Sequence, residues 1–174
     1  MFGHLIKYHS QRLFSAKYQI AGVCSEGPHS VVYQGVDPLN GEKVAIKVTK
    51  TENEGISNNF AKEKRALSII SNPHIPRILD FGRYFGKNVL VIKYFEGRTL
   101  EELHTRRFYI NPEGVRRIAL QLISALEATH GVGIVHGDIF CYKNILIGQP
   151  PYYPTLLLDF EGCRFCGPCE RHFM

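Results

Sequence analysis

The chain changes character at Gly97, and this change limits its fold more than any other feature. Before Gly97, β-branched and aromatic residues form short runs separated by turn residues, which predicts strands. The expected strands are 18–23, 30–36, 43–49, 78–84 and 88–92, and one expected helix, 58–71 with Ser57 as its cap, follows the third. The first half is therefore predicted to be an antiparallel five-stranded sheet with one helix.

After Gly97 the pattern predicts helices. Thr99 and Glu102 form a capping box for a short helix, and Asn111-Pro112 is a start signal for a longer helix that ends at Gly131. The apolar residues of the long helix cover a broad arc that includes Ala119 and Ile123, so cover is expected on more than one side. Short apolar strands are expected at 145–147 and 156–158. Together the two halves predict an α+β fold.

Composition excludes several classes of protein. The chain has 174 residues, of which 44% are hydrophobic and 21% charged, as in a folded domain. The net charge of +5 is scattered, so nucleic-acid binding is not expected, and no apolar run is long enough to span a membrane. Five cysteines, an odd number, favour an intracellular, cytoplasmic location. Residues 1–17 are expected to be a basic lead-in to the first strand, with an organelle transit peptide as the alternative. The oligomeric state is left open.

Three segments carry residues suited to phosphate chemistry. The turn from Ser25 to Tyr33 offers backbone N–H groups. Lys47 lies inside an apolar strand, where it must either extend its ammonium to solvent or find an anionic partner such as Glu63. Further on, the loop 136–144 reads HGDIFCYKN, and Asp159 follows an apolar strand. A base and oxygen ligands for a metal are thus available.

The order and spacing of these motifs resemble the eukaryotic-type Ser/Thr protein kinase family. Residues 25–32 resemble the family's glycine loop, 44–47 its third-strand motif, 63–75 its C helix and following turn, and 92–97 its gatekeeper and hinge. His136-Gly137-Asp138 is similar to the catalytic loop, and Leu158-Asp159-Phe160 to the metal-binding segment. The resemblance implies a kinase-like fold with an N-lobe at 18–92, a hinge at 93–97, an incomplete, mainly helical C-lobe at 98–162 and a Cys-rich tail at 163–174.

The resemblance also implies roles for individual residues. ATP and Mg²⁺ would be the cofactors. Lys47, steadied by Glu63, would hold phosphates; Asp138 would accept the proton of the attacking hydroxyl; and Asn144 and Asp159 would hold the metal. The remaining expected ATP contacts are Gly27, Ser30, Val32, Ala45, Lys93 and Phe95.

Several positions depart from the family pattern. Ser25 and Ser30 replace loop glycines, Gly137 replaces an Arg, and Phe140 stands where a Lys is usual. The interval from Asp138 to Asn144 is one residue longer than usual, which predicts a bulge that could turn Lys143 inward. An extra residue, Glu161, separates Phe160 from Gly162 and adds a carboxylate near the metal.

These departures leave three functions open. The leading one is an ATP-dependent kinase that acts on Ser or Thr of a protein substrate. The alternatives are a weak or inactive kinase mimic that regulates a partner kinase by binding, and a small-molecule kinase. The cysteines at 163, 166 and 169 with His172 also have the spacing of a zinc site, but an unstructured or truncated tail is the preferred interpretation.

Overall fold

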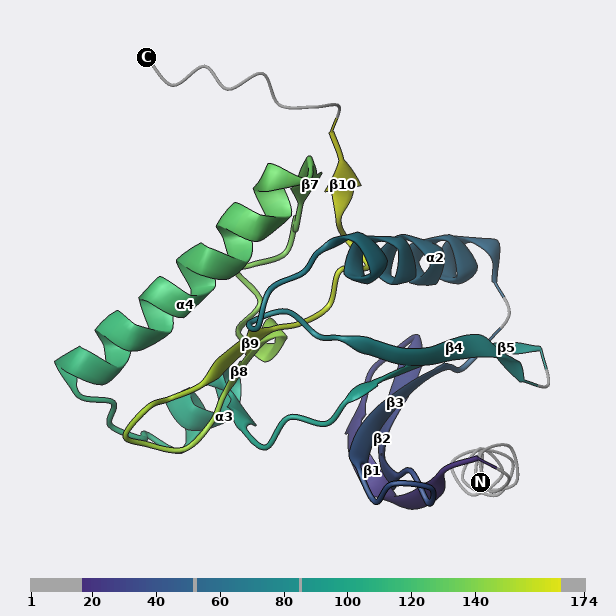
Figure 1. Ribbon diagram of the computed structural model, residues 1–174, viewed down its shortest axis with the longest axis horizontal. Coiled ribbons are helices and arrows are strands. Elements are labelled where there is room, and N and C mark those ends of the chain that lie inside the picture. Colours follow the sequence, from purple (N-terminus) through teal and green to yellow (C-terminus); the bar gives the residue numbers. More distant parts are fainter. Residues whose placement is uncertain (1–16, 52, 85, 167–174) are drawn as a thin grey trace. The chain divides into compact units, whose positions relative to one another are not determined.

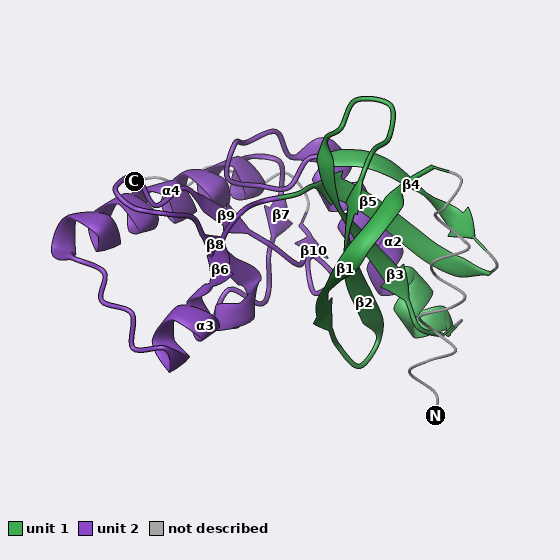
Figure 2. Cartoon of the chain, turned by 90° about the horizontal axis from the view of Figure 1, so that it is seen from below, with its two compact units in different colours: residues 1–58, 78–94 green, residues 59–77, 95–174 purple. Residues whose placement is uncertain are grey.

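A computed structural model describes residues 17–51, 53–84 and 86–166 (Figure 1). The basic lead-in lies outside the described residues, apart from Lys17, and so do Cys169 and His172 of the proposed zinc set. The chain divides into two compact units: residues 1–58 with 78–94, and residues 59–77 with 95–174 (Figure 2). Among the described helices, none combines the length and apolar character that crossing a membrane requires.

The first unit is built on a five-stranded antiparallel sheet. Its strand order is β1-β2-β3-β5-β4, and the strands are Gln19–Glu26 (β1), Ser30–Val36 (β2), Lys43–Thr49 (β3), Ile78–Tyr84 (β4) and Lys87–Lys93 (β5). Alternate residues of β2 and β3 are buried, which is the period-two pattern of a sheet with one face on a core. The core contains Tyr18, Val31, Tyr33, Val44, Ile46, Val48, Val89 and Val91. The expected five-stranded sheet is confirmed.

The helix α2 (Glu54–Ile69) begins four residues before the expected start. Ser57 lies inside α2, so its prediction as the cap is wrong. Asn53 is better placed, because its side-chain oxygen accepts a hydrogen bond from the Gly55 N–H at 2.8 Å. The error arose because Gly55 is a weak helix former and concealed the first turn.

The second unit contains short strands and two further helices. They are β6 (Arg98–Thr99), α3 (Leu100–Thr105), α4 (Pro112–Gly131), β7 (Ile134–Val135), the 3₁₀ turn η1 (Tyr142–Asn144), β8 (Ile145–Ile147), β9 (Thr155–Leu157) and β10 (Arg164–Phe165). Strands β6, β8 and β9 form one sheet, and β7 pairs with β10. The capping box of α3 and the Asn111 cap of α4 are both present, as expected.

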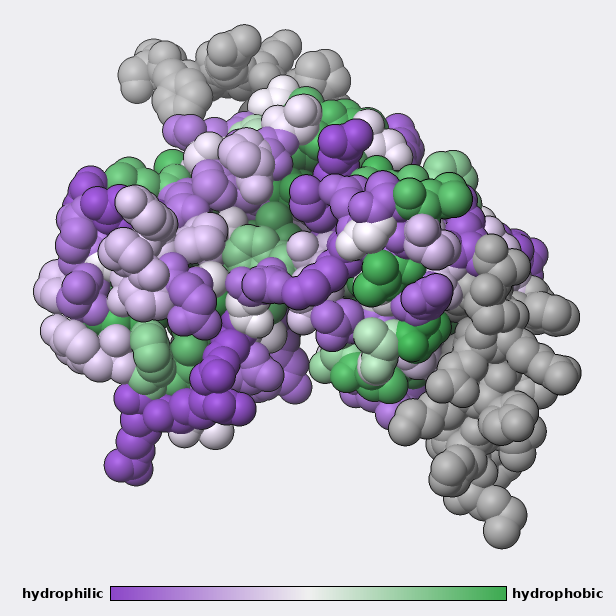
Figure 3. All heavy atoms as spheres, turned by 60° about the horizontal axis from the view of Figure 1, so that its bottom comes forward, coloured by the Kyte–Doolittle hydropathy of each residue, from purple (hydrophilic) through white to green (hydrophobic). Residues whose placement is uncertain are grey.

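Within the described residues, α4 buries a narrower stripe than its sequence predicts. Gly114, Ile118, Ala125 and Thr129 are buried, whereas Ala119 and Ile123 are exposed. The face of the molecule drawn in Figure 3 alternates small hydrophobic areas with hydrophilic ones. Periodicity identified the helix correctly but overestimated how much of it is covered.

Candidate active site

The loop 136–144 begins at a buried histidine whose ring is fixed from both sides. His136 is 2% exposed; its Nδ1 lies 3.2 Å from the Asp138 N–H and its Nε2 lies 2.8 Å from the Leu158 carbonyl. Nδ1 must accept from the N–H, so Nε2 carries the proton and donates to the carbonyl. The ring also meets the edge of the buried Phe160, with centroids 4.6 Å apart. His136 thus ties the loop 136–144 to the segment that carries Asp159.

Burial lowers the pKa of His136 below its ordinary value of 6.5. Below about pH 6.5 the unfolded chain therefore binds more protons at His136 than the folded protein does. The contribution of His136 to folding stability is thus full above that pH and declines below it. We expect the free energy of unfolding to fall between pH 7.5 and pH 5, measured by urea denaturation. His136→Gln should flatten this dependence, and His104→Gln, a change at an exposed site on α3, is the matched control. Equal pH slopes for the wild type and His136→Gln would contradict the assignment.

Asp138 and Asn144 lie together despite the long interval between them. The Asn144 side-chain N–H₂ group donates to both the main-chain oxygen and the carboxylate of Asp138, each at 3.0 Å. Asn144 is 5% exposed, whereas Asp138 is exposed. The Leu158 N–H donates to the Asn144 carbonyl at 2.7 Å, which brings the residue before Asp159 to the same place. The longer loop therefore keeps its two ends joined.

The extra residue is accommodated on the outside of the loop. Phe140 is 92% exposed, and the segment closes through a 3₁₀ turn in which the Asn144 N–H bonds to the Cys141 carbonyl. Lys143 does not turn inward: its ammonium lies 3.7 Å from Glu101, and both side chains are substantially exposed. The prediction that Lys143 could replace the missing lysine is therefore wrong, because the bulge directs it towards α3.

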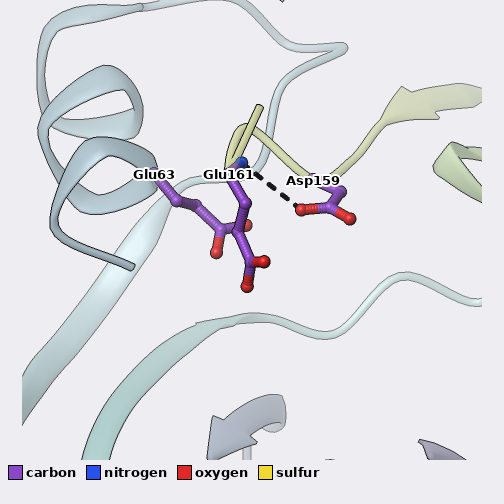
Figure 4. A group of neighbouring side chains, drawn as sticks. All are labelled: Glu63, Asp159 and Glu161. Carbon is purple, nitrogen blue, oxygen red and sulfur yellow. Dashed lines mark hydrogen bonds between the residues drawn. The ribbon is translucent and has the colours of Figure 1, made fainter. Parts of the chain in front are cut away.

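A group of carboxylates lies at the start of the segment after β9. Glu63, Asp159 and Glu161 each place one oxygen within 4.8 Å of the others (Figure 4), and Glu63 is buried. The Glu161 N–H donates to the Asp159 carboxylate at 3.4 Å (Figure 4). Asp159 has a positive φ of 63°, a conformation that Asp adopts more readily than most residues. Hard oxygen donors in such a group suit Mg²⁺.

The backbone at Gly137 leaves no room for the arginine that is usual in the family at this position. Its φ is 86°, and a Cβ at this position would lie 2.6 Å from the Gly162 carbonyl oxygen. Gly162 stands one position late because of Glu161. The two departures are thus linked, since the lengthened segment brings its backbone against Gly137. The contact between Gly137 and Gly162 could not be predicted from the sequence.

The nucleotide-contact candidates of the first unit share one face of the sheet. Val32 pairs directly with Lys47, and Ala45 lies two residues from Lys47 on the same strand. All three are half-buried and alternate with the core residues, so they occupy the opposite face. Lys47 and Glu63 belong to different units, and their ion pair stays a prediction.

Two backbone donors near these candidates are already used. The Gly27 N–H bonds to the Ser30 carbonyl at 2.9 Å, within the turn predicted to cover phosphates. The Tyr94 N–H bonds to the Lys43 carbonyl at 3.0 Å, which leaves the predicted adenine contacts to Lys93 and Phe95. Lys93 is exposed at the end of β5, and Phe95 is half-buried in the second unit. The turn therefore offers fewer donors than the sequence suggested.

Known proteins are similar in sequence to most of this chain. The profile of the protein kinase domain matches residues 18–171. The chain is 31% identical over 141 residues to a probable serine/threonine-protein kinase of Clostridium perfringens, covering 79% of this chain and 20% of that protein. It is 34% identical over 137 residues to serine/threonine-protein kinase PrkC of Bacillus subtilis, covering 76% and 21%. It is 29% identical over 159 residues to cyclin-dependent kinase D-1 of Arabidopsis thaliana, covering 90% and 39%.

The fold and these matches define a protein with a kinase domain. The chain belongs to the protein kinase family. It spans between about a fifth and two fifths of the length of these relatives.

Proposed function

We propose that the chain is an ATP- and Mg²⁺-dependent kinase that transfers the γ-phosphoryl group to a Ser or Thr hydroxyl of a protein substrate. The observation that carries this proposal is the double hydrogen bond from Asn144 to Asp138. A loop with one extra residue could have separated the base from the metal ligand, and a displacement of about 1 Å can cost 10²-fold in rate. Here the two residues stay in contact.

Each polar residue has a role that suits its chemistry. The exposed carboxylate of Asp138 accepts the proton of the attacking hydroxyl. Asn144 and Asp159 are oxygen donors for Mg²⁺, and Glu161 adds another nearby. When bound, Mg²⁺ neutralises charge on the phosphates. His136 holds the backbone on which Asp138 and Asp159 stand.

Most of the nucleotide contacts come from the first unit, and Glu63 and Phe95 of the second unit add to them. Lys47 provides a positive charge for the α- and β-phosphates, and Glu63 orients its ammonium. Val32 and Ala45 pack on the adenine ring, and the backbone at Lys93 and Phe95 meets its polar edge. Gly27 and Ser30 lie in the turn over the phosphates, with binding weakened because the Gly27 N–H is used within the turn.

Nucleotide binding is tested by the melting temperature. A ligand that binds only the native state stabilises it by about 2.7 kcal/mol at a concentration 100 times its Kd. We expect Mg-ATP to raise the melting temperature, ATP without Mg²⁺ to raise it less, and Asp159→Asn to abolish the contribution of the metal. An unchanged melting temperature of the wild type with both Mg-ATP and ATP alone would overturn the proposal.

Asn144→Asp tests the joined loop directly. The change removes both N–H donors and places a carboxylate against two oxygens of Asp138, so the loop ends should separate. Phosphoryl transfer should fall by about 10²-fold or more, measured with labelled ATP. Asn40→Asp, at an exposed turn in the first unit, is the matched control and should leave transfer unchanged. Normal transfer by Asn144→Asp would show that the contact is dispensable.

A second candidate function is regulation of a partner kinase by binding. Three observations favour it. Phe140 stands where a catalytic Lys is usual, and Lys143 is directed away towards Glu101. Val115, Leu120 and Ile123 are also exposed along α4, as at many protein interfaces. This candidate predicts nucleotide binding without transfer.

A further inference from the structure

The outward-facing Phe140 has no role in the function proposed above. Its side chain is 92% exposed, while its neighbours Ile139 and Cys141 are half-buried. The hydrogen bonds between Asn144 and Asp138 join the two ends of the loop. They restrain the loop from opening at its ends, which is one way in which Phe140 could become buried. Burying a Phe side chain is favourable because it removes a large apolar surface from water, and in the free protein this gain is not realised.

The position of Phe140 relative to Asp138 limits what can cover it. Two residues of extended chain span at most about 7 Å, so the ring is held close to the carboxylate that would receive the acceptor hydroxyl. The residues that flank the acceptor in a peptide have Cα atoms about 3.8 Å from its own. A substrate whose hydroxyl reaches Asp138 therefore brings a flanking side chain to the ring.

The charges of the loop 136–144 favour an apolar side chain of the substrate against Phe140. Lys143, its single cation, lies 3.7 Å from Glu101, which offsets its charge. Tyr142, which is 55% exposed, is a second aromatic residue in the loop. Apolar contact is therefore the main attraction that this part of the loop offers, and a rigid aromatic ring loses little entropy when covered.

We propose that Phe140 is a specificity-determining residue that selects Ser or Thr acceptors flanked directly by a large apolar side chain. This inference rests on the proposed function, because it takes the acceptor hydroxyl to Asp138. It adds the substrate class, which is a peptide segment with an apolar residue next to the phosphorylated one.

Paired peptides test the selection. The two peptides of a pair have the same sequence around a Ser, except that one has a Leu and the other a Gly directly beside it. In the first pair the varied residue precedes the Ser, and in the second pair it follows the Ser. For one pair, the wild type should show a KM about tenfold lower for the Leu peptide, with a similar kcat, as expected when roughly half of a large apolar side chain leaves water. Phe140→Ala should reduce the ratio to below about twofold, and Phe140→Leu should retain most of it. An unchanged ratio in Phe140→Ala would overturn the inference while leaving the kinase proposal intact.

A fluorescence reporter separates binding from catalysis. The chain contains no tryptophan, so Phe140→Trp introduces a single one. Its emission should shift to shorter wavelength with the favoured Leu peptide in the presence of Mg-ATP, and not with the Gly peptide. Leu39→Trp is the matched control, since Leu39 is 91% exposed in the turn between β2 and β3 and should not respond. A shift without phosphorylation would support apolar peptide contact at Phe140 but overturn the proposed reaction, and with it the role of Phe140 in acceptor selection. Phosphorylation without a shift for any peptide would overturn the inference alone.

Discussion

Asp138→Asn is expected to lower phosphoryl transfer by about 10²–10⁴-fold while leaving nucleotide binding unchanged. The amide cannot accept the proton of the attacking hydroxyl, but its oxygen can still accept the hydrogen bond from Asn144, so the loop should keep its shape. The rate is measured with labelled ATP and a mixture of Ser and Thr peptides, and binding by the rise in melting temperature with Mg-ATP.

The matched control for this change is Asp37→Asn, in the first unit. The side-chain oxygen of Asp37 accepts a bond from the Leu39 N–H, a role that Asn can also fill. Its transfer rate should equal that of the wild type. Equal rates for Asp138→Asn and the wild type would show that another residue accepts the proton, or that Asp138 is not at the reaction centre.

Gly137→Ala is expected to be the most destabilising small change in the catalytic loop. A φ of 86° costs a residue with a Cβ about 1–2 kcal/mol, and the added carbon would stand 2.6 Å from the Gly162 oxygen, so the backbone must move. The total should be about 2–4 kcal/mol, or roughly 5–15 °C in melting temperature. Arginine, the residue usual in the family, should be tolerated no better.

Gly131→Ala provides the comparison, because a Cβ there meets nothing within 4 Å and the residue lies in the last turn of α4. It should be neutral or stabilise by up to about 1 kcal/mol. Equal melting temperatures for Gly137→Ala and Gly131→Ala would contradict the contact between Gly137 and the segment containing Glu161.

Local patterns were sufficient to predict most of the fold. Alternating β-branched residues identified the sheet, and the caps at Thr99 and Asn111 fixed where two helices begin, because these signals act within a few residues. The start of α2 was missed where Gly55 weakened the signal. The narrow buried stripe of α4 could not be predicted, since it depends on which distant segments pack against the helix.

The candidate site was predictable in its residues but not in its geometry. The motifs identified Asp138, Asn144 and Asp159, yet only the structure shows that the extra residue is absorbed by turning Phe140 outward. It also links Gly137 to Gly162 and brings Glu161 close to Glu63 and Asp159. These contacts join residues far apart in sequence, and spacing alone carries no information about them.

The most direct test of the proposed function is whether the wild-type chain transfers phosphate from Mg-ATP. The purified protein is incubated with labelled ATP and either Ser/Thr peptides or a set of small-molecule alcohols, beside Asp138→Asn. The proposed kinase function predicts labelled peptide at a rate at least about 10²-fold above that of Asp138→Asn, with one ADP formed per phosphate transferred. Bound Mg-ATP with peptide labelling no higher than in Asp138→Asn, or labelling of small alcohols alone, would contradict it.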